Sequence, residues 1–160
     1  MALYGVRQMT LSYIQSGSRL LLMERNHQPL KGYWLPPGGH VEKNEDAYVA
    51  AIHEVKEESG LTIKSMRCKA MITLATSTNE NALLYAFWSD DFEGTPVSSA
   101  EGTLRWIEID DIPTLRIPNS DAYIFPLIRD HAGHEPLFIK CQLDGDDVME
   151  VMVNGVGRII

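Results

Sequence analysis

The chain has 160 residues, of which 44% are hydrophobic and 22% charged, and its formal net charge is -8 at pH 7. This length and composition are typical of one globular domain with its own core, and they exclude a disordered or fibrous protein. The excess of acidic residues excludes the broad basic face that binding to duplex nucleic acid requires.

Membrane and redox signals are absent from the sequence. No apolar run approaches the roughly 18 residues of a membrane span, and the first ten residues lack the apolar core of a signal peptide. Cys68 and Cys141 stand without CxxC spacing or a nearby histidine cluster, which indicates neither zinc nor a disulfide framework. We therefore expect a cytoplasmic protein with no membrane partner and two reduced, buried thiols. The sequence leaves a homodimer open as an alternative to a monomer.

The first 39 residues predict a strand pair followed by a loop. Two stretches within residues 5–26 flank a Gly/Ser turn at 16–18. In the second strand Leu20, Leu22 and Glu24 fall on one face, and Leu21, Met23 and Arg25 on the other. Residues 26–39 contain three prolines and three glycines and are interpreted as a loop.

A helix is predicted from Glu45 to Ser59. Asn44 is the expected N-cap and Gly60 the expected C-cap, while Glu45 and Asp46 favour the positive end of the helix dipole. The residues expected to face the core are Ala47, Tyr48, Ala51, Ile52 and Val55. Beside that face, Glu54, Glu57 and Glu58 fall within an arc of roughly 100°, so their carboxylates are expected to converge.

The rest of the chain predicts more strands and one further long helix. Strands are expected at 63–76 and 82–90 around a polar turn at 77–81, then a loop at 92–103, a strand at 104–109 and a short Asp-capped helix start at 110–115. A helix is expected at 120–131, starting late because Pro126 would otherwise disturb it, and a hairpin at 136–154 turns at 145–147. One domain over residues 1–160 with an α/β sandwich around a mixed sheet follows from this order.

Three converging carboxylates predict a divalent cation. They would raise one another's pKa unless a positive charge lay among them, and hard oxygen ligands suit Mg²⁺, with Mn²⁺ as the alternative. The preceding Gly38 can bring its carbonyl close to a metal because no side chain obstructs it. Mg²⁺ is commonly shared with substrate phosphates, so the cation would bind an anionic substrate despite the acidic chain.

The spacing Gly39, Glu45, His53-Glu54-Val55, Glu57-Glu58 and Gly60-Leu61 resembles the Nudix box. His53 departs from it, because the family usually has an arginine there that helps to orient the catalytic glutamate. Two roles are open for His53, an orienting residue or a surface residue beside Lys56. The resemblance implies a Nudix fold, an α/β/α sandwich around a mixed sheet, and hydrolysis of a nucleoside polyphosphate by metal-activated water.

Roles for the acids follow from this resemblance. Glu57 and Glu58 are the implied principal metal ligands, and Glu54 is a further ligand or the base that deprotonates the attacking water. Glu45 matches a structural or outer-sphere glutamate. Glu101 matches an acidic loop residue that reaches the metal site in MutT-like enzymes.

Beyond the box, the chain is similar in order and spacing to MutT-like 8-oxo-dGTP diphosphatases. This similarity implies a small nucleotide substrate, an oxidised or other purine nucleoside triphosphate, that is cleaved to the monophosphate and pyrophosphate. Arg25 is a candidate phosphate contact, and Trp34 lines the site or anchors its loop in the core. Asn119 and Asp121 are the candidates for base recognition, where mammalian members carry a Trp-Pro-Asp-Asp run that this chain lacks.

Three alternatives remain at this stage. ADP-ribose hydrolases usually place a proline, and dinucleoside-polyphosphate hydrolases a tyrosine, some sixteen to seventeen residues after the box, where residues 73–81 contain neither. The third alternative is a non-catalytic nucleotide-binding module. Intact Glu54, Glu57 and Glu58 favour an enzyme, because a binding module has no need of the metal carboxylates.

Overall fold

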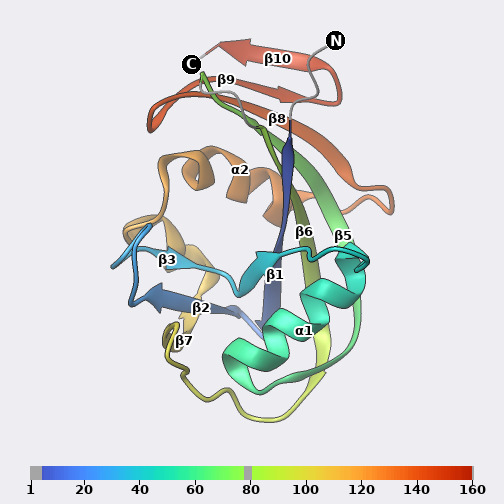
Figure 1. Ribbon diagram of the computed structural model, residues 1–160, viewed down its shortest axis with the longest axis vertical. Helices are drawn as coiled ribbons and strands as arrows, with labels where there is room; N and C mark the ends of the chain where they lie inside the picture. The colour runs from blue at the N-terminus through green and yellow to red at the C-terminus, as the bar shows by residue number, and fades with distance from the viewer. Residues whose placement is uncertain (1–4, 78–80, 160) are drawn as a thin grey trace.

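The computed structural model describes residues 5–77 and 81–159 (Figure 1). Its elements in chain order are β1 (Val6–Ser16), β2 (Arg19–Arg25), β3 (Trp34–Leu35), β4 (Gly38–His40), α1 (Ala47–Ser59), β5 (Thr62–Ala75), β6 (Asn81–Glu93), β7 (Gly102–Glu108), the 3-10 helix η1 (Ile109–Thr114), α2 (Asn119–Asp130), β8 (Leu137–Asp144), β9 (Asp147–Val153) and β10 (Val156–Ile159).

The strands form one mixed sheet, as the sequence predicts. They pair in the order β10-β9-β8-β5-β6-β1-β2-β3, with β4 beside β1 and β7 beside β2. The β1–β6 and β5–β8 pairs are parallel and the others antiparallel. Residues 6–14 of β1 pair with β6 and residues 15–16 pair with β2, so β1 joins the two parts of the sheet.

The two helices cover opposite faces of this sheet. Tyr13 and Ile14 are neighbours on β1, and strand side chains alternate between faces. The Tyr13 ring lies 5.7 Å from that of Phe125 on α2, whereas Ile14 packs in a second core cluster with Val55 of α1. Figure 1 shows α1 crossing β1 and α2 lying beneath the β8–β9 hairpin. The α/β/α arrangement is therefore present.

The second strand separates the two cores as predicted. Leu20 and Leu22 belong to the cluster beneath α2, and Leu21 to the cluster beneath α1. All three are at most 2% exposed. A strand with apolar residues on both faces is buried on both faces, which explains its continuous apolar run.

Helix α1 begins later than predicted. Asp46, not Asn44, is the N-cap, because its Oδ1 accepts a hydrogen bond of 2.9 Å from the Val49 N–H. Asn44 lies outside the helix with a φ of 67°, a left-handed conformation that Asn tolerates better than most residues. The C-terminal end is as predicted, because Gly60 has a φ of 77° and donates its N–H to the carbonyl of Lys56.

The core face of α1 also differs in part from the prediction. Ala51 and Val55 are fully buried, but Tyr48 is 40% exposed and Ala50 is buried in its place. The Tyr48 hydroxyl instead accepts a hydrogen bond of 3.4 Å from the Met66 N–H, and its ring meets Phe87 edge-on. Tyr48 therefore covers the margin of the sheet because its polar end needs a partner there.

Several short elements were missed or misplaced. Strands β3 and β4 lie inside the predicted loop at 26–39, and β10 was not predicted. The short helix has Glu108 at its N-cap position with no side-chain hydrogen bond, so the predicted Asp cap is wrong. Strands β3 and β4 form through pairing with β2 and β1, partners that a local pattern does not contain, whereas β10 forms a hairpin with the adjacent β9. The polar turn expected at 77–81 lies partly outside the described residues.

Helix α2 starts at Asn119, earlier than predicted. Pro126 is accommodated inside it, near its middle, where it removes one backbone N–H from the helical ladder. Ile124, Phe125 and Ile128 remain buried around that position. Tertiary packing thus overrides the local effect of the proline. Neither α1 nor α2, nor any other helix in the described part of the chain, is long and apolar enough to cross a membrane.

The position of the N-cap can be tested by substitution. Asp46→Ala is expected to lower the free energy of unfolding by about 1 kcal/mol, because the Val49 N–H loses its acceptor. Asn44→Gly is the matched control and is expected to change it by a few tenths of a kcal/mol at most, because glycine accepts a positive φ. Urea denaturation measures both; a larger loss for Asn44→Gly would contradict this assignment.

Candidate active site

Two glycines let helix α1 approach the sheet closely. Gly38 and Gly39 lie in β4, which pairs with residues 9–11 of β1. A Cβ atom at Gly39 would collide with the carboxyl group of Glu54, and one at Gly38 with the backbone carbonyl of Thr10. Both positions therefore require glycine for space, and the carboxyl group of Glu54 lies directly over the β4 backbone.

Glu58 is the most buried acid of the site. Its relative exposure is 7%, and its Oε2 accepts a hydrogen bond of 3.1 Å from the Gly38 N–H. Burial, together with the charges of Glu54 and Glu101, raises the pKa of Glu58 to about 8, against the opposing effects of the Gly38 hydrogen bond and the Arg25 charge. The local environment therefore disfavours a bare carboxylate at this position.

The pKa of Glu54 is also raised, but by less than that of Glu58. It is half-buried, and burial, followed by the charges of Glu57, Glu45 and Glu101, raises its pKa to about 7. The two carboxyl groups lie on the same side of α1, facing successive glycines of one strand. A positive charge beside them would relieve both burial and repulsion.

The predicted convergence holds for Glu54 and Glu58 but is incomplete for Glu57. Glu57 is exposed, and its charge reaches Glu54. Among residues 5–77 and 81–159, no three His, Cys, Asp or Glu side chains form a group that could hold a metal ion. Successive residues of a helix are about 100° apart around its axis, so Glu57 projects toward solvent while Glu58 projects toward the sheet.

Glu101 approaches the two acids from the loop before β7. It is exposed, and its charge contributes to the raised pKa values of both Glu54 and Glu58. Its carbonyl accepts a hydrogen bond of 2.9 Å from the Asn26 N–H, and its own N–H donates to the hydroxyl of Ser99. The backbone thus fixes this loop next to the end of β2.

His53 contacts the start of the helix instead of the buried acids. Its Nδ1 lies 3.1 Å from Oε2 of Glu45, and its ring is 63% exposed. The other Glu45 oxygen accepts a hydrogen bond from the Glu42 N–H. The charge of Glu45 raises the pKa of Glu54, so His53 can influence Glu54 only indirectly, through its contact with Glu45.

Arg25 supplies the nearest positive charge. It ends β2, its Nε donates to the carbonyl of Pro29 at 2.9 Å, and its charge lowers the pKa of Glu58. The two terminal nitrogens of the guanidinium remain as donors, because that bond uses only Nε. Arg25 therefore lies close enough to influence a group bound at the acids.

Asp121, one of the two candidates for base recognition, lies beside Trp34. Trp34 and Asp121 line a small cavity of about 10 Å³ with Tyr13 and Phe125. Burial raises the pKa of Asp121 to about 7, opposed by a hydrogen bond from Ser120. Asn119 is exposed at the start of α2, and its amide nitrogen donates to the carbonyl of Asp146 at 3.0 Å.

Sequence reasoning missed the floor of the site. Thr10 and Ser12 are fully buried on the α1 face of β1, and Ser12 donates its N–H to the carbonyl of Pro37. The Ser12 hydroxyl is buried with no hydrogen-bond partner among the described residues. The available signal was the presence of two polar residues in an otherwise apolar strand. Their position beneath the glycine turn could not be predicted, because it depends on the pairing of β1 with the distant β4.

Comparison with known proteins identifies the family. The model of the NUDIX domain matches residues 7–128, which is more than half of the chain. The chain belongs to the Nudix family. A Bacillus subtilis relative described as an uncharacterized Nudix hydrolase, YvcI, is 27% identical over 133 residues, covering 80% of this chain and 82% of that protein.

One further relative and one solved structure are similar to this Nudix chain over most of its length. The mouse oxidized purine nucleoside triphosphate hydrolase is 30% identical over 132 residues, covering 80% of this chain and 85% of that protein. The crystal structure of a MutT protein from Bacillus halodurans superimposes with a TM-score of 0.79 at 22% identity, covering 92% of this chain and 97% of that one. The fold is that of MutT proteins, and the chain is a Nudix pyrophosphohydrolase.

The two glycines of β4 give a direct test of this geometry. Gly39→Ala is expected to displace the Glu54 carboxyl group and to lower pyrophosphohydrolase activity by about 100-fold, because a shift of about 1 Å suffices for such a loss. The urea midpoint should remain near that of the wild type, since the side chain can move.

Gly38→Ala is the matched comparison, because its Cβ meets backbone and not a side chain. We expect it to lower the urea midpoint strongly. Equal activity in Gly39→Ala and wild type would contradict the position of Glu54.

Proposed function

We propose that this Nudix enzyme hydrolyses a purine nucleoside triphosphate to the monophosphate and pyrophosphate with Mg²⁺ as its cofactor. The observation that carries the proposal is the pair of acids, Glu54 and Glu58, packed against the Gly38–Gly39 backbone with Arg25 beside them. An oxidised purine such as 8-oxo-dGTP is the proposed natural substrate.

The donor set suits a hard divalent cation. Carboxylate oxygens are the ligands that Mg²⁺ prefers, and burial makes the charge of Glu58 costly without a cation. We assign Glu54, Glu57 and Glu58 as ligands, with Glu101 and the Gly38 carbonyl completing the set. Glu57 is exposed, so rotation of its side chain toward a cation meets no packing obstacle. Mn²⁺ is expected to substitute, because it accepts the same oxygen ligands.

Held by these acids, Mg²⁺ would supply polarisation of the phosphate oxygens and a more nucleophilic water near neutral pH. Glu54 is half-buried and accessible from solvent, so we assign it to accept the proton of the attacking water. The water oxygen bonds to phosphorus, and the bond to the pyrophosphate leaving group breaks. His53 holds Glu45, whose charge acts on Glu54, and is therefore assigned as a positioning residue.

The remaining residues are assigned to substrate binding. The terminal nitrogens of Arg25 can donate to phosphate oxygens that lie over the acids. Trp34 and Asp121 line one cavity whose volume of about 10 Å³ admits little more than a water, so the purine is assigned to its mouth. Asp121 donates a hydrogen bond when protonated and accepts when ionised, and Asn119 at the start of the same helix can do both.

Similarity to one relative favours an oxidised purine. The mouse enzyme, named for hydrolysis of oxidized purine nucleoside triphosphates, aligns over 80% of this chain, well beyond the box. The sequence of residues 73–81 contains neither the proline usual in ADP-ribose hydrolases nor the tyrosine usual in dinucleoside-polyphosphate hydrolases after the box. A triphosphate is therefore preferred over both rivals.

The metal assignment predicts the effect of one isosteric change. Glu57→Gln is expected to reduce Mg²⁺-dependent pyrophosphate release to the background of the assay, because a neutral amide is a poor ligand for Mg²⁺. Coupled detection of pyrophosphate measures the rate. Glu93→Gln, an exposed glutamate paired with Lys64 on the far end of β6, is the control and should keep wild-type activity. Near-normal turnover by Glu57→Gln would refute the metal assignment.

The substrate assignment predicts a ranking. A panel of 8-oxo-dGTP, dGTP, dATP, dCTP, ADP-ribose and diadenosine tetraphosphate should give the highest kcat/KM for a purine triphosphate. Phosphate released after adding inorganic pyrophosphatase reports triphosphate cleavage, and separation of products by chromatography reports the other two. A higher kcat/KM for ADP-ribose or the dinucleotide would reject the triphosphate assignment while leaving the metal site intact.

A further inference from the structure

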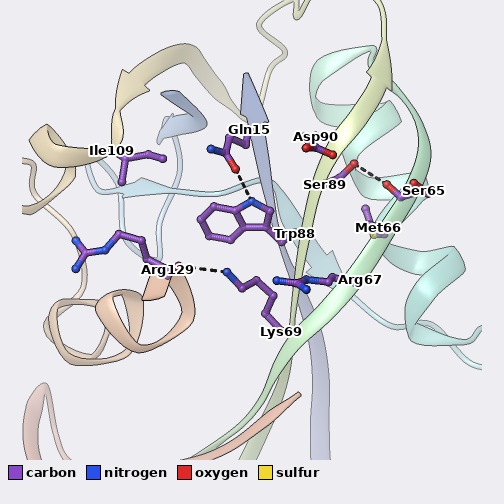
Figure 2. Close-up of a pocket in the computed structure, with 10 residues that line it drawn as sticks. All are labelled: Gln15, Ser65, Met66, Arg67, Lys69, Trp88, Ser89, Asp90, Ile109 and Arg129. Atoms are coloured by element: carbon purple, nitrogen blue, oxygen red, sulfur yellow. Dashed lines mark hydrogen bonds between the residues drawn. The ribbon is translucent and has the colours of Figure 1, made fainter. Parts of the chain in front are cut away.

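A second cavity lies away from the catalytic acids. Its volume is about 610 Å³, within the range of small-molecule sites, and its walls come from β1, β5, β6, η1 and α2. Figure 2 shows Trp88 at its centre, with Lys69 and Arg67 below the indole and Gln15 above it. We call it the Trp88 cavity, defined by Gln15, Ser65, Arg67, Lys69, Trp88 and Asp90 among its lining residues.

Lys69 is a buried cation in this cavity. It is 5% exposed, its Nζ lies 4.2 Å from the centroid of the Trp88 ring, and it donates a hydrogen bond of 3.3 Å to the carbonyl of Arg129. An ammonium group has three donors, so two remain beyond that bond. Burial, followed by the charge of Arg67, lowers the pKa of Lys69, and the charge of Asp130 opposes this in part.

Arg67 adds a second positive charge beside the first. It lies on the same strand two positions earlier, and Figure 2 shows its guanidinium directed toward Lys69. In the described part of the chain, neither Arg67 nor Lys69 forms an ion pair with a carboxylate. Two like charges of which one is buried are unfavourable unless an anion lies between them.

The nearby acids are hydrogen-bonded to other groups, although the charge of Asp130 also acts on Lys69. Asp130 binds the Arg129 guanidinium through both oxygens at 2.8 and 3.0 Å, and Asp91 accepts a hydrogen bond from Ser65. Asp90 lines the cavity and is exposed, and Figure 2 shows it on the opposite side of Trp88 from Arg67. The positive end of the cavity is therefore the end formed by Arg67 and Lys69.

The catalytic acids are remote from this end. Gln15 lies five residues along β1 from Thr10, which pairs with Gly39, so about 16 Å of strand separates them. The Trp88 ring stacks on Tyr13 and therefore lies on the α2 face of the sheet, whereas Glu54 and Glu58 lie on α1. A group bound in the Trp88 cavity would not touch the catalytic acids.

We propose that the Trp88 cavity binds a small phosphate-type oxyanion between the Lys69 ammonium and the Arg67 guanidinium. Both groups make charge-assisted hydrogen bonds to such an anion. In a chain of net charge -8 this local pair attracts anions where the rest of the surface repels them.

The cavity recognises the oxyanion and not a nucleobase. One face of the Trp88 indole is covered by Lys69, and Tyr13 stacks against the ring at 5.4 Å with an interplanar angle of 23°. The Trp88 Nε1–H donates to Gln15 at 2.8 Å, and the Gln15 amide donates in turn to the carbonyl of Gly17. The ring and amide that would bind a base are already engaged.

Titration followed by NMR tests this site. The Trp88 indole N–H resonance, assigned by its loss in Trp88→Phe, is followed while inorganic phosphate, pyrophosphate or AMP is added in EDTA at constant ionic strength. Omitting divalent metal leaves the catalytic acids without a cation, so the anions have no metal-dependent site there. The wild type should show saturable shifts with phosphate and pyrophosphate.

Two variants and one control decide the result. Arg67→Gln, at an exposed position, is expected to weaken phosphate binding about tenfold, the effect of losing one charge-assisted hydrogen bond. Lys69→Met should abolish the saturable shift while its side chain still covers Trp88. Lys64→Gln is the control, because Lys64 lies on the same strand, pairs with Glu93 and does not line the cavity; it should bind within twofold of the wild type.

Three outcomes would overturn the proposal. The first is a wild-type shift that does not saturate, and the second is Arg67→Gln binding phosphate as tightly as Lys64→Gln does. The third is AMP binding more than tenfold tighter than phosphate, which would contradict recognition of the oxyanion alone. None of them depends on catalytic activity, so the test is independent of the proposed substrate.

Discussion

The contact between helix α1 and the glycine turn determines the geometry of the site. Glu54 and Glu58 can approach the backbone of β4 only because residues 38 and 39 have no side chains. That approach removes water from the carboxyl groups and raises the pKa of both. The mixed sheet, the N-cap at Asp46 and the C-cap at Gly60 all serve to hold the helix at this distance.

Charge explains how an acidic chain can act on an acidic substrate. The acids on α1 form the proposed cation site, and Arg25 adds a positive charge beside them. On the other face of the sheet the signs are reversed, because Arg67 and Lys69 meet without a carboxylate partner in the described residues. In each case groups of like charge are held together by the fold, and an ion of opposite charge would reduce their repulsion.

Local rules predicted the features that depend on local sequence. The shared side of Glu54 and Glu58 on α1 and the C-cap at Gly60 could be predicted from helical periodicity and from the conformational freedom of glycine, whereas Glu57 lies outside the predicted convergence. The choice between Asn44 and Asp46 as N-cap could not, because both residues cap helices well and only the backbone conformation distinguishes them. The Trp88 cavity was also missed. A β-bulge between Cys68 and Ala70 shifts the alternation of β5, so that Lys69 and Ala70 both lie on the α2 face, which a regular strand pattern does not predict.

The central claim is that buried acids on α1 form a site for a divalent cation, and calorimetric titration with Mg²⁺ tests it most directly. The wild-type protein, without nucleotide, should bind Mg²⁺ saturably, and Glu58→Gln should lose that binding while keeping its urea midpoint. Equal Mg²⁺ affinity in Glu58→Gln and the wild type would contradict the claim, because the most buried acid would then make no contribution to the cation site.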